Sequence, residues 1–373
     1  MSTNPPSLPP QLEPTAPSSS PPTPTPTPNP PPPSAAPPAV DPLLAEREVI
    51  EKLGRGRERI LAELGKAIVG QQEVIEQILL ALVAGGHCLI TGAPGLAKTL
   101  LVKSIAQIFH LRFQRIQFTP DLMPADITGT EILQDSGGER RMVFVPGPVF
   151  ANMILADEIN RTPPKTQAAL LEAMQEHQVT VAGVRHTLAP PFFVLATQNP
   201  IEMEGTYPLP EAQLDRFMFN VVMDYLPEND EVEVIVRTTG RKSERIEPLF
   251  DGADVLRFHE MVRQVPVAEE VVRYAVRLAA ASRPVAGAPS FVTDWVTWGA
   301  GTRAAQNLVL GGKARALLQG RAHVTVEDIQ SLALPVLRHR LLLNYRAEAD
   351  GVRVDTLVRK LLETVTAPGK TQV

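Results

Sequence analysis

The strongest constraint in this sequence is a turn of small residues that separates a short apolar strand from a helix. It reads Gly92-Ala-Pro-Gly-Leu-Ala-Lys98-Thr99. This matches the phosphate-binding loop at every defined position except one, where Ala97 replaces a glycine. We expect ordinary helical dihedral angles at Ala97, so its methyl group should cause no clash. The pattern predicts a nucleotide site, and the alternative is a strand-to-helix turn without a ligand.

The residue types in this loop suit contact with phosphate groups. The two glycines supply a flexible backbone whose N–H groups can face phosphate oxygens at a helix N-terminus. Lys98 can neutralise the β- and γ-phosphates, and the hydroxyl group of Thr99 can bind Mg²⁺. We therefore expect ATP and Mg²⁺ as cofactors. The loop residues assigned to the nucleotide are Gly92, Ala93, Pro94, Gly95, Leu96, Ala97, Lys98, Thr99 and Leu100.

Two acids follow the apolar strand predicted at 152–156 and form the second part of the site. Asp157 would hold Mg²⁺ through water, and Glu158 would orient and deprotonate the attacking water. Two carboxylates at a buried strand end repel each other unless a cation is present. Alone, the pair is also compatible with an acidic loop. Beside a phosphate-binding loop, it indicates a catalytic site.

Apolar strands alternate with helices through the first part of the chain. This order predicts a parallel sheet of five strands covered on both faces, with an α/β fold. Thr162 and Pro163 are expected to begin a helix, as its N-cap and first residue. Two segments read as inserted hairpins, at 130–144 and 179–188. The predicted strands are 87–91, 113–118, 152–156, 192–197 and 217–223, and the predicted helices include 43–66, 71–84 and 98–109.

The chain divides into three regions by composition. Residues 1–40 contain 17 of the 37 prolines and a single charged residue, Glu13. Such a segment buries too little apolar surface to offset its ordering entropy, so we predict a disordered tail. Residues 41–227 carry the strand–helix alternation, and residues 228–373 read as an all-helical domain.

Charge and cysteine content exclude several classes of protein. The net charge is −5, which excludes a globally basic nucleic-acid binder. The single cysteine, Cys88, excludes an internal disulfide framework and fits a reducing, cytoplasmic compartment. The uncharged stretch at 77–97 is interrupted by glycines and a proline, so no membrane span is expected.

Taken together, these motifs resemble the MoxR family of AAA+ ATPases over residues 43–366. The P-loop NTPase core and the helical lid of that family would account for the two predicted domains. Ala97 agrees with the family pattern. The stretches that carry the resemblance are Ala84-Gly-Gly-His, Gly95-Leu-Ala-Lys-Thr, Phe118-Thr-Pro-Asp121, Asp126-Ile-Thr-Gly-Thr130, Pro146-Gly-Pro-Val-Phe-Ala-Asn152, Ala156-Asp-Glu-Ile-Asn-Arg-Thr-Pro-Pro-Lys-Thr-Gln167, Ala196-Thr-Gln-Asn-Pro200, Glu204-Gly-Thr-Tyr-Pro-Leu-Pro-Glu-Ala-Gln-Leu-Asp-Arg-Phe217 and Leu337-Arg-His-Arg-Leu341.

The resemblance assigns roles to further residues. Asn199 matches sensor 1, although the residues alone are equally compatible with an Asn-Pro turn. Arg216 matches the arginine finger, which would reach the γ-phosphate in a neighbouring subunit; the alternative is a surface ion pair. Arg303 matches sensor 2 at the start of a lid helix; the alternative is a helix-start arginine that faces solvent. Gly70 matches the segment that lines the adenine pocket, for which a plain loop is the alternative.

The resemblance also implies a function. It predicts ATP hydrolysis in a homo-hexameric ring, chaperone-like remodelling or maturation of protein complexes, and a partner with a von Willebrand factor A domain. The hairpins would face the pore or the client, with Arg140, Arg141, Arg185 and His186 as candidate contacts, unless they are only solvated loops. The alternatives are a nucleotide-gated scaffold with little turnover and a DNA-directed motor. Stable nucleic-acid binding is not expected.

Overall fold

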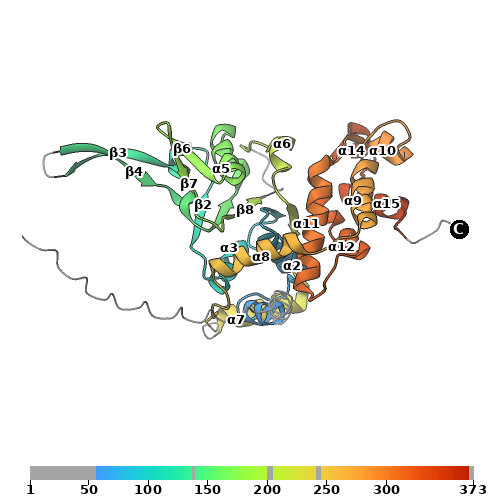
Figure 1. Cartoon of the computed structure of the whole chain (residues 1–373), viewed down its shortest axis with the longest axis horizontal. Helices are drawn as coiled ribbons and strands as arrows, with labels where there is room; N and C mark the ends of the chain where they lie inside the picture. Colours follow the sequence, from blue (N-terminus) through green and yellow to red (C-terminus); the bar gives the residue numbers. More distant parts are fainter. Residues whose placement is uncertain (1–55, 137–138, 200–204, 241–244, 369–373) are drawn as a thin grey trace, which may run out of the picture. The chain divides into compact units, whose positions relative to one another are not determined.

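The centre of the fold is a parallel sheet of five strands, in the order β2-β5-β8-β1-β9. Two of these strands, β2 and β8, are labelled in Figure 1. The computed structural model describes residues 56–136, 139–199, 205–240 and 245–368. The tail predicted at 1–40 lies outside the described residues, as does the first part of the helix predicted at 43–66. All five predicted strands are confirmed. They are β1 (Cys88–Gly92), β2 (Phe113–Gln117), β5 (Met153–Asp157), β8 (Phe193–Gln198) and β9 (Phe219–Met223).

Two hydrophobic cores form because successive side chains of a strand point to opposite faces of the sheet. In β5, Met153 and Leu155 belong to one core, and Ile154 and Ala156 belong to the other. Helices α2 (Gln72–Ala84) and α3 (Lys98–Ile108) contribute to the first core, and α5 (Pro164–Glu176) contributes to the second. The predicted sheet with both faces covered is confirmed.

The start of α5 differs from the prediction by one residue. The helix begins at Pro164, with Pro163 at the N-cap position. The Thr162 hydroxyl donates instead to the carbonyl oxygen of Thr119, at 3.1 Å. A tertiary contact therefore uses the side chain that we expected to cap the helix.

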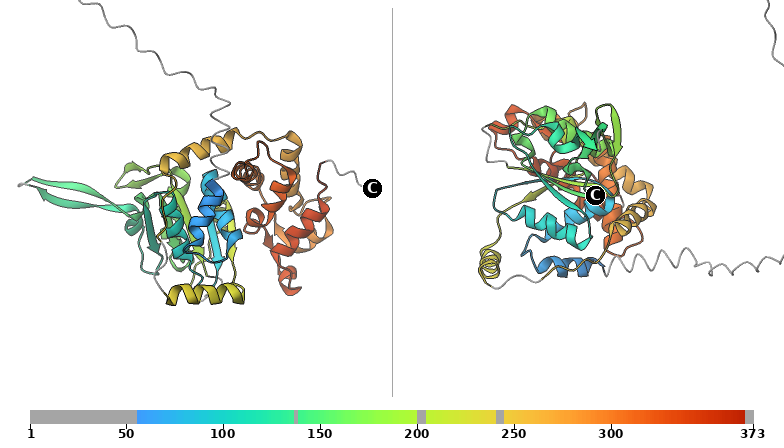
Figure 2. Two further views of the ribbon diagram at one scale, coloured as in Figure 1. Left: turned by 90° about the horizontal axis from the view of Figure 1, so that it is seen from below. Right: turned by 90° about the vertical axis from the view of Figure 1, so that its left-hand side faces the viewer.

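Both predicted hairpins are present. The longer one pairs β3 (Gly129–Ser136) with β4 (Glu139–Pro146), and it projects well beyond the sheet (Figure 2). The shorter one pairs β6 (Gln178–Val181) with β7 (Val184–Thr187). Its turn residues Ala182 and Gly183 both have positive φ, at 48° and 82°. Two such residues are typical of a type I′ turn, whose twist matches that of the paired strands.

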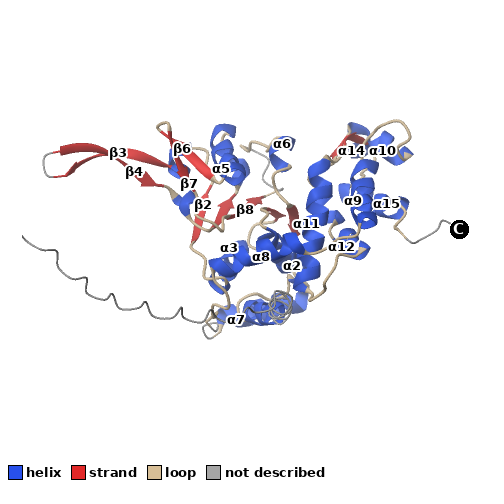
Figure 3. Cartoon of the chain, viewed as in Figure 1, coloured by secondary structure: helices blue, strands red, loops and turns tan. Residues whose placement is uncertain are grey.

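The carboxyl-terminal region is helical, with one exception to the all-helical prediction (Figure 3). Strands β10 (Val296–Trp298) and β11 (Leu342–Leu343) form a short antiparallel pair. The predicted division of the folded part after residue 227 stays a prediction. The helices are α7 (Glu228–Thr239), α8 (Gly252–Gln264), α9 (Glu269–Ala281), α10 (Ser290–Trp295), α11 (Thr302–Leu318), α12 (Val326–Ser331), α13 (Ala333–Leu337), α14 (Tyr345–Ala349) and α15 (Val354–Thr364).

Short elements connect the strands of the α/β part. They are α4 (Pro124–Thr128), α6 (Glu211–Leu214) and the 3₁₀ helices η1 (Pro148–Phe150) and η2 (Ile159–Arg161). Helix α11 contacts α2, α8 and α9, and so packs the carboxyl-terminal helices against the sheet region. Among the described helices, none has both the length and the apolar character needed to cross a membrane.

Candidate functional site

The two glycines of the phosphate-binding loop are required for different reasons. A Cβ atom on Gly92 would lie 2.4 Å from the carbonyl oxygen of Met223, so the close approach of β1 to β9 excludes a side chain. Gly95 has a φ of +82° and open space around its Cα atom. This left-handed conformation favours glycine. Glycine is therefore needed at 92 for close packing and at 95 for the backbone conformation.

Ala97 does not have the helical dihedral angles that we predicted. Its φ and ψ are 57° and 27°, in the left-handed region, and it is the N-cap of α3. Its carbonyl oxygen accepts a hydrogen bond from the N–H of Leu101, at 3.0 Å. The left-handed conformation costs a non-glycine residue roughly 1–2 kcal/mol. This cost explains why the strict pattern has glycine at this position. In this chain the residue is alanine, and its left-handed conformation is stabilised by the surrounding loop and helix start.

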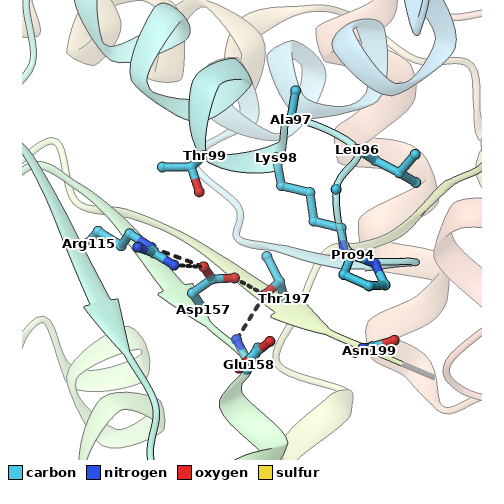
Figure 4. Close-up of a pocket in the computed structure, with 11 residues that line it drawn as sticks. Pro94, Leu96, Ala97, Lys98, Thr99, Arg115, Asp157, Glu158, Thr197 and Asn199 are labelled. Atoms are coloured by element: carbon cyan, nitrogen blue, oxygen red, sulfur yellow. Dashed lines mark hydrogen bonds and ion pairs between the residues drawn. The ribbon is translucent and has the colours of Figure 1, made fainter. Parts of the chain in front are cut away.

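The loop and the strand ends enclose a cavity of about 400 Å³ (Figure 4). The cavity brings together most of the residues predicted from the two motifs. It also includes Arg115 and Thr197, which we had not assigned to the site. The lining residues are Pro94, Gly95, Leu96, Ala97, Lys98, Thr99, Arg115, Asp157, Glu158, Thr197 and Asn199.

Lys98 extends from the start of α3 into this cavity. Its ammonium group donates to the carbonyl oxygen of Gly92, at 2.5 Å. Burial lowers the pKa of Lys98, and the nearby charges of Asp157 and Glu158 partly oppose that shift. A half-buried ammonium group beside backbone N–H groups is a suitable partner for an anionic ligand.

The Asp157 carboxylate is held from two sides at the end of β5. One oxygen accepts a hydrogen bond from the Thr197 hydroxyl, at 2.6 Å. The other accepts from the Nε and Nη2 atoms of Arg115, at 3.0 and 2.6 Å. The N–H of Glu158 donates to the same Thr197 hydroxyl, at 2.9 Å. Thr197 therefore fixes both acids relative to β8.

Glu158 lies in a strained and well-defined position. Its φ and ψ are 58° and 49°, in the left-handed region that non-glycine residues rarely adopt. Its Oε2 atom accepts from Gln117, at 2.9 Å, and pairs with Arg161, at 3.1 Å. A residue keeps such a strained conformation only where several surrounding contacts hold it there, and strained residues of this kind cluster at functional sites.

The donor set fits Mg²⁺ bound together with a nucleotide. Thr99 and Asp157 present oxygen atoms on the same side of the cavity, and Mg²⁺ prefers oxygen ligands. Within the described ranges, no group of three or more His, Cys, Asp or Glu side chains could hold a metal by itself. Mg²⁺ commonly relies on one or two protein ligands completed by phosphate and water, and this pair suits that mode.

Three residues assigned by family resemblance lie away from this cavity. Gly70 lines a separate hollow with Gln71, Leu226 and Pro227. Arg216 donates to the carbonyl oxygen of Leu171 in α5, at 2.7 Å. Arg303, at the start of α11, pairs with Asp215, at 3.4 Å. Of the loop residues, Gly92, Ala93 and Leu100 also lie outside the cavity lining.

Arg340 fastens the segment that carries Arg216 to the carboxyl-terminal helices. Its side chain is only 2% exposed, and its Nε atom pairs with the carboxylate of Asp215, at 2.7 Å. Its remaining N–H groups donate to the carbonyl oxygens of Asp215, Phe217, Met218 and Val336. Burial lowers the pKa of Arg340 to about 10, against the opposing effect of Asp215. The segment on either side of Arg216 is therefore fixed by a buried cation.

The two hairpins present their predicted contact residues differently. Arg140 and Arg141 are exposed on β4, and Arg140 pairs with Asp135, at 3.8 Å. Arg185 is exposed on β7. His186 differs from the three arginines, because its ring stacks on Phe144 with centroids 3.8 Å apart. That contact joins the shorter hairpin to the longer one, and the predicted role of His186 as a client contact stays a prediction.

Comparison with known proteins gives a consistent result. The family model "ATPase family associated with various cellular activities (AAA)" matches residues 87–219, and the "AAA lid domain" model matches residues 292–361. Chaperone MoxR1 of Mycobacterium tuberculosis is 42% identical over 312 residues, which cover 83% of this chain and 82% of that protein. Protein MoxR of Methylorubrum extorquens is 32% identical over 328 residues, which cover 83% and 94%. A solved structure from Cytophaga hutchinsonii superposes with a TM-score of 0.81 at 41% identity, covering 87% of this chain and 98% of that one.

Proposed function

Because this chain belongs to the MoxR family of AAA+ ATPases, we propose that it binds ATP with Mg²⁺ and hydrolyses it in a homo-hexameric ring. The observation that carries the proposal is the single cavity shared by Lys98, Thr99, Asp157 and Glu158. An ammonium group, a hydroxyl group and carboxylates are the side chains with which P-loop NTPases bind phosphate and Mg²⁺ and position water.

Each side chain has a defined task in this proposal. Lys98 and the loop N–H groups bind the β- and γ-phosphates. Thr99 and Asp157 hold Mg²⁺, which when bound neutralises charge that develops on the phosphate oxygens. Glu158 orients the attacking water and takes its proton. Asn199 is buried at the end of β8 and lines the same cavity, from which its amide positions the water or the γ-phosphate.

Arg216 acts from the neighbouring subunit. Within one chain its guanidinium group contacts α5 and does not line the cavity of that chain. A site completed by an arginine from another copy would hydrolyse ATP only in the assembled ring, because the cation stabilises charge of the transition state. Gly70 and Arg303 lie outside the cavity that holds the phosphates, so in this proposal they contact other parts of the nucleotide, from the loop before α2 and from the lid.

The ring uses the hydrolysis cycle for chaperone-like remodelling or maturation of protein complexes in the cytoplasm. The relative named Chaperone MoxR1 supports this role. The projecting hairpin β3–β4, with Arg140 and Arg141 on it, supplies the client-facing surface. A separate protein with a von Willebrand factor A domain is the proposed partner.

Subunit mixing tests the shared site. We would measure the ATPase rate per subunit against protein concentration for the wild type, Glu158→Gln, Arg216→Ala and an equal mixture of the two variants. The rate should rise with concentration, fall in each variant and partly return on mixing, because some interfaces then pair an intact Glu158 with an intact Arg216. Arg273→Ala, at an exposed residue of α9, is the matched control and should behave as the wild type.

Other outcomes point to other functions. Bound ATP with a wild-type rate near zero would favour the nucleotide-gated scaffold. A rate that depends on added DNA would favour a DNA-directed motor. A rate independent of concentration, with no recovery on mixing, would contradict the shared site.

A further inference from the structure

We propose that Arg115 is a resident counter-cation of the metal site, which holds Asp157 until Mg²⁺ displaces it. The inference rests on the proposed function, because it concerns how the same cavity loads Mg²⁺ with ATP. It adds a positioning residue from β2, an edge strand that none of the nucleotide motifs includes.

The geometry places a guanidinium group on the carboxylate assigned to the metal. Two N–H groups of Arg115 donate to one oxygen of Asp157, at 3.0 and 2.6 Å, and Thr197 donates to the other oxygen (Figure 4). A carboxylate offers about four acceptor positions, so three are already used. Arg115, Thr99 and Asp157 line the same cavity. The guanidinium group therefore lies in the same cavity as the two residues assigned to Mg²⁺.

The register of the sheet puts Arg115 there. Gln117 of β2 is directly opposite Asp157 of β5, and Arg115 is opposite Leu155. Side chains of alternate residues share a face, so Arg115, Gln117, Leu155 and Asp157 point to the same side. Because Arg115 is at the edge of the sheet, its long side chain can reach across to the carboxylate two residues further along the neighbouring strand. Gln117 accepts a hydrogen bond from Arg115 and steadies it.

Charge balance then decides what Arg115 does. Asp157 is only 14% exposed at its side chain, and an unpaired carboxylate there would repel the phosphates of ATP. Arg115 cancels this charge when no Mg²⁺ is present. Mg²⁺ held by this carboxylate, directly or through water, would place a second cation beside the guanidinium group, so the two cations would compete for Asp157. Arg115 therefore supports ATP binding without Mg²⁺ and opposes Mg²⁺ binding.

This reasoning predicts a change in the linkage between ATP and Mg²⁺. We would measure the Kd of a fluorescent ATP analogue in EDTA and at saturating Mg²⁺, using the full chain. In Arg115→Gln, binding in EDTA should weaken roughly tenfold, as expected for loss of one nearby charge. The Mg²⁺ concentration that gives half-maximal binding should fall by a similar factor. The Kd ratio, defined as the Kd in EDTA divided by the Kd in Mg²⁺, should therefore rise about tenfold or more.

Two variants keep the test specific. Arg115→Lys retains the charge and should change the Kd ratio much less than Arg115→Gln. Arg112→Gln removes an exposed arginine that lies just before β2 and outside the cavity lining, and it should leave the ratio unchanged. Circular dichroism of each variant verifies the fold.

The outcomes separate the two proposals. A higher Kd ratio in Arg115→Gln supports the counter-cation. An unchanged ratio, a lower ratio, or an equal loss of affinity in EDTA and in Mg²⁺ would overturn it, since each shows that Arg115 does not compete with the metal. Failure of the wild type to bind the analogue in either buffer would instead refute the proposed ATPase function.

Discussion

Arg340 is the residue whose removal should most clearly test the link between the carboxyl-terminal helices and the sheet region. Its guanidinium group is almost fully buried, and every N–H group on it has a partner. Arg340→Met keeps an unbranched apolar stem but removes the charge and all donors. Asp215 then loses its closest cation, and the carbonyl oxygens of Phe217 and Met218 lose their donor.

The expected cost follows from these contacts. Removing one partner of a buried ion pair typically destabilises a protein by about 3–5 kcal/mol. Asp215 is about one-third exposed and still pairs with Arg303 at 3.4 Å. The free-energy cost of leaving its carboxylate without Arg340 is therefore reduced. The buried carbonyl oxygens remain without a donor. We therefore expect Arg340→Met to lower the free energy of unfolding by about 3 kcal/mol, and Arg340→Lys to lose roughly half as much.

Urea unfolding followed by circular dichroism measures this loss. The matched control is Arg346→Met, because Arg346 is 69% exposed and pairs with Asp294 only at 3.7 Å. Exposed pairs of this kind contribute about 0–1 kcal/mol. The reasoning is refuted if Arg340→Met costs less than about 1 kcal/mol or no more than the control. In that case the segment around Arg216 is held by other contacts.

Three further predictions concern the sheet and the loop. Burial lowers the pKa of His87 to about 4. Between pH 6.5 and pH 4 its imidazole is therefore protonated in the unfolded chain but neutral in the native state. Stability should fall as the pH drops through that window, by about 3 kcal/mol from this group, and His87→Gln should flatten the profile by that amount; an unchanged slope would contradict the burial argument. Ala97→Gly should raise the midpoint of thermal unfolding slightly and Ala97→Val should lower it, because of the left-handed φ, and the opposite order would show that the loop relaxes. Thr197→Val should reduce the ATPase rate about tenfold with little change in ATP affinity, since it releases both Asp157 and Glu158; a loss confined to affinity would refute this role.

The predictions that succeeded depend on residues close together in the sequence. A phosphate-binding loop occupies eight consecutive residues, and the acid pair directly follows an apolar strand. The order of apolar strands and helices also determined the parallel sheet, because parallel strands need crossover connections. These features require no knowledge of which distant segments meet. That Lys98, Thr99, Asp157 and Glu158 lie close together, as they do around one cavity, could therefore be predicted from the sequence.

Tertiary structure decided the features that depend on distant contacts or on a single backbone angle. Arg115 meets Asp157 only because β2 pairs with β5 in one register, and no local pattern encodes that register. The strain at Ala97 and Glu158 is imposed by the surrounding packing, against the local preference of each residue. Arg340 reaches Asp215 across 125 residues of sequence, through the packing of helices on the sheet. The local sequence thus determined which side chains are available to bind a ligand. Long-range packing decided which charged residues, such as Arg115 and Arg340, hold Asp157 and Asp215 in place.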